Sequence, residues 1–180
     1  MADDLNKYSS QSKSIDAWCK TKTLTLSNRN SATYTIIPVT PHTTDGKIHL
    51  PNGVRKLNQL TTLNIQYYPV EVIDPWISNL ANLEELIIIS PKLDSLPSSL
   101  GYLTNLKKLI ISGYDTKAPI NKLPDSLVNL TSLEKLAITN TNITQLPTNF
   151  EKLNQLTSLS LKNNNLTSLP EKIGEISTLI

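Results

Sequence analysis

Cysteine, glycine and aromatic residues are scarce in this chain of 180 residues. The one cysteine, Cys19, excludes an intramolecular disulfide and a cysteine-rich metal site. The five glycines are isolated from one another, so the chain has no glycine-rich phosphate loop. Its longest apolar run, at 86–89, is far too short to span a bilayer, and we therefore expect no membrane insertion.

Charge is also sparse and nearly balanced. The 17 Lys and Arg residues exceed the 15 Asp and Glu residues by only two, and no block of like charges occurs. This balance does not indicate a polyanionic partner, so we expect no nucleic-acid binding. Residues 1–14 are polar and Ser-rich and lack the pattern of a Sec-type signal peptide. We therefore expect a cytoplasmic protein, or one delivered into a host cell by a non-Sec route.

Leucine and isoleucine, in contrast, recur at a regular spacing. In the segment 156–179, apolar residues occupy positions 1, 4, 6, 11, 14, 18 and 21, and a proline occupies position 15. The same pattern starts at Leu60, Leu83, Leu106, Leu133 and Leu156, with a period of 23 residues except for 27 between Leu106 and Leu133. Self-similarity at a fixed period indicates a repeat architecture.

The spacing within each repeat predicts how one repeat folds. The L-x-L alternation at positions 4 to 6 is typical of a strand with inward and outward side chains. The proline cannot donate a backbone hydrogen bond and restricts its own backbone, which favours an extended or tight-turn return. One repeat cannot bury its own apolar face, but stacked repeats form a continuous core beneath a parallel sheet.

The repeat reads L-x-x-L-x-L-x-x-N-x-L-x-x-L-P-x-x-L-x-x-L over roughly residues 50–180, and it resembles the leucine-rich repeats of bacterial and Ras-suppressor-type proteins. The resemblance implies an α/β repeat solenoid, a horseshoe or arc with a parallel concave sheet and short turns or 3-10 segments on its convex side. It also implies a protein-interaction module without catalysis. The family's asparagine at position 9 occurs here as Asn164, and the other counterparts are Tyr68, Pro91, Tyr114 and Thr141.

Three regions follow one another along the chain. Residues 1–22 form a polar N-terminal segment in which we expect a short capping helix. Residues 23–49 contain one or more irregular first repeats, with Leu24 and Leu26 at positions 4 and 6 of a strand. Residues 50–180 are leucine-rich repeats that end without a cap.

Residues suited to catalysis are few. His42 and His49 have no Asp, Glu or Cys at metal-ligand spacing. Cys19 has no histidine placed beside it by the sequence. We therefore expect no enzymatic activity, no catalytic residue, no metal site and no cofactor. An enzyme that uses Cys19 or a histidine remains an alternative.

The outward strand positions carry the leading functional prediction. Position 5 holds, in successive repeats, Asn64, Ile87, Ile110, Ala137 and Ser160, and position 7 holds Gln66, Ile89, Ser112, Thr139 and Lys162. Ile87, Ile89 and Ile110, with Tyr67 nearby, are expected to form an exposed apolar patch in the middle of the sheet. We expect another protein to bind at this patch, although β-branched residues also simply suit a strand.

The long repeat that starts at Leu106 provides a second candidate contact element. Its four extra residues fall within 112–121, and insertions in repeat proteins form loops on one face, often the binding face. We expect Tyr114, Asp115 and Lys117 in this loop to contact the partner.

The last residues suggest an alternative function. Leu179 and Ile180 begin another strand that has no successor, and an unpaired strand edge can pair with a second chain. The alternative is therefore a self-assembling structural module, with a homodimer joined end to end. A bacterial, effector-like role is a further hypothesis attached to the binding module.

Overall fold

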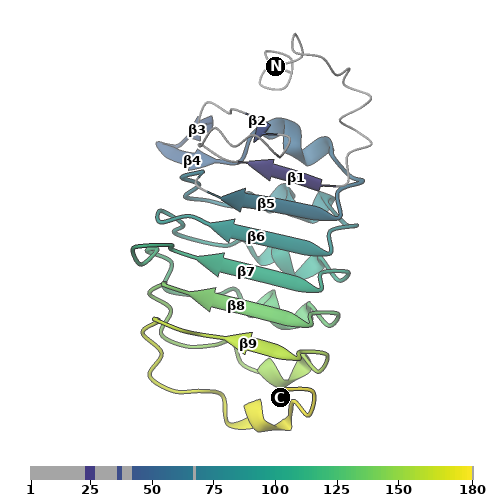
Figure 1. Cartoon of the computed structure of the whole chain (residues 1–180), viewed down its shortest axis with the longest axis vertical. Helices are drawn as coiled ribbons and strands as arrows, with labels where there is room; N and C mark the ends of the chain where they lie inside the picture. The colour runs from purple at the N-terminus through teal and green to yellow at the C-terminus, as the bar shows by residue number, and fades with distance from the viewer. Residues whose placement is uncertain (1–22, 27–35, 38–41, 67, 180) are drawn as a thin grey trace.

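The computed structural model describes residues 23–26, 36–37, 42–66 and 68–179 of the chain (Figure 1). The predicted capping helix and Cys19 lie outside these residues. Seven strands of the described part form one parallel sheet, in which neighbouring strands lie side by side along the long axis of the molecule. In spatial order they are β2 (Ile36–Ile37), β1 (Thr23–Leu26), β5 (Thr62–Gln66), β6 (Glu85–Ile89), β7 (Lys108–Ser112), β8 (Lys135–Thr139) and β9 (Ser158–Ser160).

Short 3-10 helices return the chain on the other side of the solenoid. The described residues contain η1 (Asn52–Lys56), η2 (Pro75–Asn79), η3 (Ser98–Tyr102), η4 (Asp125–Asn129), η5 (Phe150–Lys152) and η6 (Glu171–Glu175). Pro51, Pro97, Pro124 and Pro170 directly precede η1, η3, η4 and η6. Each of these prolines is extended, as its restricted backbone favours, and the turn begins at the next residue. The predicted repeat solenoid with short 3-10 segments is confirmed.

Adjacent strands pair without a shift in register. The position-4 residues Leu63, Leu86, Leu109, Leu136 and Leu159 lie opposite one another along the sheet. Leu24 pairs with Leu63 and Leu26 with Ile65, which confirms their predicted positions 4 and 6. Register matters here because a slip of one residue would turn every inward side chain toward solvent.

The inward side chains form one continuous core. Leu86 and Leu109 are completely buried, and Leu136 is 1% exposed. Each such side chain contributes roughly 1.5–3 kcal/mol relative to an exposed position, before the loss of conformational entropy is subtracted. Leu159 on β9 packs against this core but is only partly buried. Burial therefore depends on having a neighbouring repeat on both sides.

A two-stranded hairpin precedes the regular repeats in the chain. Strands β3 (His42–Thr44) and β4 (Lys47–His49) are antiparallel, and the turn between them places Asp45 at φ 55° and Gly46 at φ 79°. Two consecutive positive φ values are typical of a type I′ hairpin. The repeat spacing does not predict this hairpin, although Asp45-Gly46 is a strong local signal for one. His49 forms a parallel bridge with Val72 of the next repeat, so the hairpin is joined to the stack.

His49 links the hairpin to the next repeat through two carboxylates. The side chain of His49 is 9% exposed. Nδ1 lies 2.9 Å from an oxygen of Asp74, and Nε2 lies 3.1 Å from an oxygen of Asp45. Both nitrogens can donate only in the protonated ring. Burial alone would lower the pKa of His49, but the hydrogen bonds to Asp45 and Asp74 outweigh it, so the pKa of His49 is raised.

The repeat that starts at Leu60 provides the carboxylate for this link because its proline is shifted by one residue. Where other repeats have proline at position 15, this one has Asp74, and Pro75 follows as the first residue of η2. The hydrogen bond from His49 also lowers the pKa of Asp45, so that this carboxylate is ionised wherever His49 becomes charged. The hairpin is therefore held by a charge-assisted contact.

We predict that this contact makes stability depend on pH. Because the pKa of His49 is raised on folding, its stabilising effect is complete below the ordinary value of 6.5 and is lost as the pH rises through the raised value. His49→Gln should therefore lower the free energy of unfolding, measured with urea, more at about pH 6 than at about pH 9.

The partners of His49 provide the controls. Asp74→Asn should reduce the same pH dependence, whereas Asp94→Asn, which removes the ion pair with Lys47 instead, should leave it in place. An equal cost of His49→Gln at both pH values would contradict the link.

Candidate functional site: the concave face of the sheet

The outward side chains of the sheet form three aligned columns, which we call the concave face. The columns correspond to repeat positions 3, 5 and 7 and run across β5 to β9. Position 3 holds Thr62, Glu85, Lys108, Lys135 and Ser158, position 5 holds Asn64, Ile87, Ile110, Ala137 and Ser160, and position 7 holds Gln66, Ile89, Ser112 and Thr139, with Lys162 just beyond β9. Packing of the inward neighbours holds this face in place.

Three isoleucines lie together in the middle of the concave face. Ile87 on β6 pairs in register with Ile110 on β7, and Ile89 lies one outward position beyond Ile87. All three are partly exposed. We call them the aliphatic patch. They are three of the predicted binding residues, whereas Tyr67, which was predicted beside them, lies outside the described residues.

Polar and small residues surround the aliphatic patch. On β5 the equivalent positions are Asn64 and Gln66, which pair with Ile87 and Ile89. On β8 the neighbour of Ile110 is Ala137, and the next position on β9 is Ser160. The aliphatic patch is thus confined to the two central strands. This contrast favours a specific contact area over a general preference of strands for β-branched residues.

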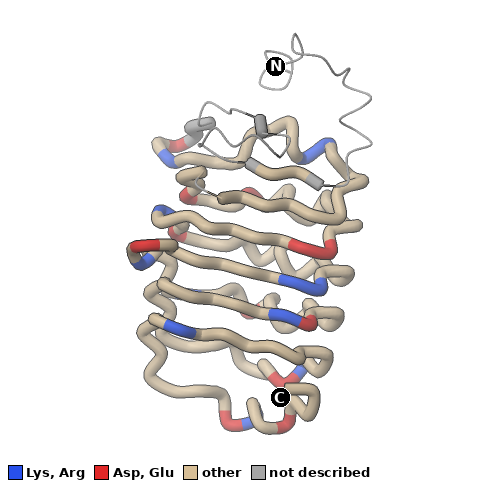
Figure 2. The backbone as a smooth tube through the Cα atoms, in the orientation of Figure 1, with Lys and Arg blue, Asp and Glu red and all other residues tan. Residues whose placement is uncertain are grey.

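Charged residues lie toward the ends of the strands, and the middle of each strand is uncharged (Figure 2). At the amino ends, Glu84 lies 3.0 Å from Lys107, and Glu85 lies 3.3 Å from Lys108. These pairs confirm the expected opposite charges across neighbouring strands. The hydrogen bond that Lys107 donates to the Glu84 carboxylate raises the pKa of Lys107. Exposed pairs of this kind stabilise little and mainly favour the correct register.

The structure locates the four inserted residues more exactly than the sequence, which places them only within 112–121. Ala118 bridges to Thr141 of the next repeat, so the regular pattern resumes there and the four extra residues are 114–117. Position 9 of this repeat is therefore Ala118 and not Tyr114, which is a correction to the alignment of the repeats. The loop extends from the carboxyl end of β7 (Figure 1), and Tyr114 is 43% exposed on it.

The loop is attached to the following repeats. The amide of Asn140 donates to the carbonyl of Tyr114 at 2.9 Å, and the ammonium of Lys117 donates to the Asn165 amide oxygen at 2.5 Å. A Cβ added at Gly113 would lie 2.3 Å from the carbonyl oxygen of Asn140, so the base of the loop requires glycine. Tyr114, Asp115 and Lys117 are all exposed beside the concave face, and Lys117 also holds the loop through its hydrogen bond to Asn165.

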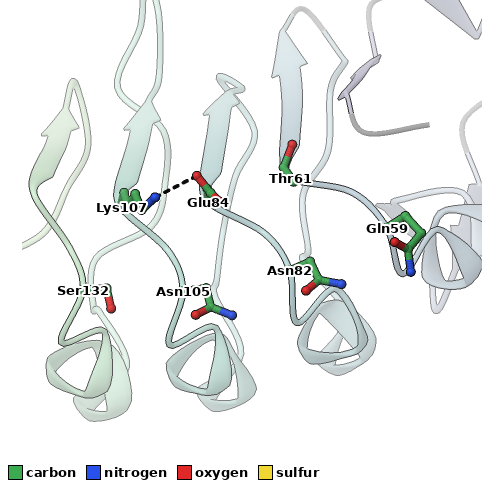
Figure 3. Close-up of a pocket in the computed structure, with 7 residues that line it drawn as sticks. All are labelled: Gln59, Thr61, Asn82, Glu84, Asn105, Lys107 and Ser132. Carbon is green, nitrogen blue, oxygen red and sulfur yellow. Dashed lines mark hydrogen bonds and ion pairs between the residues drawn. The ribbon is translucent and has the colours of Figure 1, made fainter. Parts of the chain in front are cut away.

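A polar groove of about 400 Å³ lies at the amino ends of the strands (Figure 3). It is lined by Gln59, Thr61, Asn82, Glu84, Asn105, Lys107 and Ser132. The amide of Asn82 donates to the carbonyl of Asn58 at 2.8 Å, and that of Asn105 donates to the carbonyl of Ala81 at 3.0 Å. These amides join successive repeats, and the groove also contains the Glu84–Lys107 ion pair. We assign this groove to packing between repeats and not to a ligand.

Of the candidate catalytic residues Cys19, His42 and His49, the structure describes the side chain of His49 alone. Its Nδ1 is hydrogen-bonded to Asp74 and its Nε2 to Asp45. Within the described ranges no group of three His, Cys, Asp or Glu residues could hold a metal ion. No helix in the same ranges is both long and apolar enough to cross a bilayer. Cys19 and the side chain of His42 lie outside the described part of the chain.

Comparison with solved structures identifies the repeat type, whereas no family model and no curated protein matches the chain. A leucine-rich repeat protein of Leptospira interrogans superposes with a TM-score of 0.66 at 26% identity, over 72% of this chain and 32% of that one. The described part of the chain is built from leucine-rich repeats.

Two further structures have the same architecture. An internalin of Listeria monocytogenes matches this leucine-rich repeat protein with a TM-score of 0.57 at 21% identity, over 74% of this chain and 44% of that one. A TDR receptor matches with a TM-score of 0.53 at 26% identity, over 73% of this chain and 27% of that one. The present chain spans less than half the length of each of these proteins.

Proposed function

We propose that this leucine-rich repeat protein binds another protein through its concave face, with the aliphatic patch at the centre of the contact. The fold supports an interaction module in general, because stacked repeats build an extended surface that changes little on binding. The proposal needs no chemical step. Recognition results from a preformed surface, which limits the entropy lost on binding.

The observation that carries this proposal is the pairing of Ile87 with Ile110 on the exposed side of the sheet. Outward positions do not contribute to the core, so aliphatic residues there are not needed for folding. Contiguous exposed apolar surface usually marks an interaction site. Tyr114 on the adjoining loop supplies an aromatic side chain at the edge, and such residues are enriched in interfaces.

The cellular setting extends the same proposal. Two of the matching structures come from bacteria, which supports a bacterial origin. We infer a protein that acts in the cytoplasm, or in a host cell as an effector after delivery by a non-Sec route. In either place its role is recognition of a protein partner.

Substitution of the aliphatic patch tests the proposal. Ile87→Asp combined with Ile110→Asp should weaken partner binding by about tenfold or more, because two charges would be buried in the contact. The measurement is the amount of partner recovered from bacterial and host-cell lysates by the immobilised protein. Circular dichroism and thermal unfolding verify that the variant is folded.

Tyr102→Asp is the matched control, because Tyr102 is 73% exposed on η3, away from the sheet. It should recover the same partners as the wild type. Full recovery of partners by the double isoleucine variant, in its folded form, would exclude the aliphatic patch as the binding site.

A second candidate function is self-association through the end of the solenoid beside β9. Leu169 is 54% exposed there. Leu159, Leu161 and Leu166 are only partly buried, whereas their counterparts in the preceding repeat are buried. A second copy of the chain could cover these side chains.

Leu179 and Ile180, the residues predicted from the sequence to mediate self-association, are not the exposed groups on which this candidate rests. Leu179 is partly buried against the core, and its N–H donates to the carbonyl of Ile176 at 3.2 Å. Ile180 lies outside the described residues. Leu169 is therefore the more exposed apolar group at this end.

Sedimentation over a range of concentrations tests self-association. The wild type should form a dimer as the concentration rises, and Leu169→Glu should shift it toward the monomer, because a charge would be buried at the contact. Ser168→Glu, at the exposed neighbouring residue, is a control for added charge. A wild type that stays monomeric at every concentration would exclude this function.

A further inference from the structure

The concave face has an excess of positive charge on the β8 and β9 side of the aliphatic patch. In the position-3 column, Glu85 is paired with Lys108, but the next residue in register with Lys108 is Lys135, another cation. Lys162 follows β9 at position 7. Neither Lys135 nor Lys162 forms an ion pair with any described residue. Lys135 is the first residue of β8, whereas Lys162 lies beyond the carboxyl end of β9.

The nearby acidic residues do not balance these two lysines. Glu134 precedes Lys135 at position 2 of the repeat; both residues are exposed, and no ion pair joins them. Asp115 lies in the loop after β7 and is exposed. Lys117 in the same loop is a further cation, because its hydrogen bond to the neutral amide of Asn165 leaves its charge in place. Lys135 and Lys162 are the two cations on β8 and just beyond β9.

Small side chains cover the surface between the two lysines. The outward residues there are Ala137, Thr139, Ser158 and Ser160. None has a long side chain, so the backbone of a partner can approach the sheet closely at this point. The surface has cationic groups on two sides and the aliphatic patch next to it, across the pairing of Ile110 with Ala137.

We propose that the partner presents an extended acidic segment to the concave face. An aliphatic side chain of that segment packs on Ile87 and Ile110, and carboxylates further along it bind Lys135 and Lys162. This inference rests on the proposed function and specifies the chemistry of the partner. A basic segment would place like charges together at the same lysines, which suppresses binding.

The distance between strands determines how far apart the aliphatic and acidic residues of the bound segment should be. Strands lie about 4.8 Å apart, so the distance from β7 to β9 is roughly 10 Å. An extended chain rises about 3.3 Å per residue and covers this distance in about three residues. The segment should therefore carry its acidic residues about three positions from its aliphatic residue.

Selection from a random peptide library tests this inference without a known partner. The probes are displayed peptides of about twelve residues, long enough to cross the whole face. Selection on the immobilised wild-type chain should enrich peptides with an aliphatic residue and Asp or Glu about three positions away, and should deplete Lys and Arg. The most enriched peptide is then synthesised, and its affinity is measured by fluorescence anisotropy.

Charge reversal on the concave face gives the quantitative test. Lys135→Glu and Lys162→Glu should each raise the Kd of the synthetic peptide by about tenfold. Added salt should also raise the Kd for the wild type. Lys152→Glu changes the net charge equally, but it lies on η5 on the opposite side and should leave the Kd unchanged.

The outcomes separate this inference from the proposed function. An unchanged Kd in both lysine variants, with binding lost in the Ile87→Asp and Ile110→Asp variant, would overturn the acidic segment and retain the concave face. An unchanged Kd in that isoleucine variant would overturn both. Enrichment of basic peptides, or of no peptides, would also overturn the acidic segment.

Discussion

The whole structure depends on one constraint, that no repeat can bury its own apolar face. Leu86 and Leu109 are completely buried because a strand with the same inward residues lies on each side of them. Parallel pairing without a register shift keeps these residues aligned. The prolines before the 3-10 helices favour the turns that return the chain to the start of the next strand. Stability and shape therefore result from contacts between neighbouring repeats.

The same constraint separates folding from recognition. Inward positions must be leucine or isoleucine, whereas the outward positions on the same strands can vary without loss of core packing. Ile87 and Ile110 occupy such outward positions in the middle of the sheet, and Lys135 occupies one at the amino end of β8. The two irregular parts, the hairpin and the insertion, are attached to the stack by side-chain hydrogen bonds. His49 joins the hairpin to Asp74, and Asn140 and Asn165 hold the insertion.

The period of the repeats predicts the strands, their inward residues and the alignment of Ile87 with Ile110, because one spacing repeats without interruption there. It does not predict side chains that compensate for irregularities. The hydroxyl of Tyr68 donates to the carbonyl of His49, and Ser90 donates to the carbonyl of Val70. Asn164, the asparagine at position 9, donates to the carbonyls of Ile138 and Leu161. Three of these four contacts join residues 19 to 26 positions apart, and they depend on the exact path of each loop.

The most direct test of this account compares one substitution at equivalent places in two repeats. Leu109 and Leu159 both occupy position 4, but Leu109 has strands on both sides, whereas Leu159 lies on β9 at the end of the described sheet. In urea unfolding, Leu109→Ala should lower the free energy of unfolding by about 2–5 kcal/mol, and Leu159→Ala should lower it by about half as much or less. Equal losses at the two positions would contradict the dependence of stability on stacking.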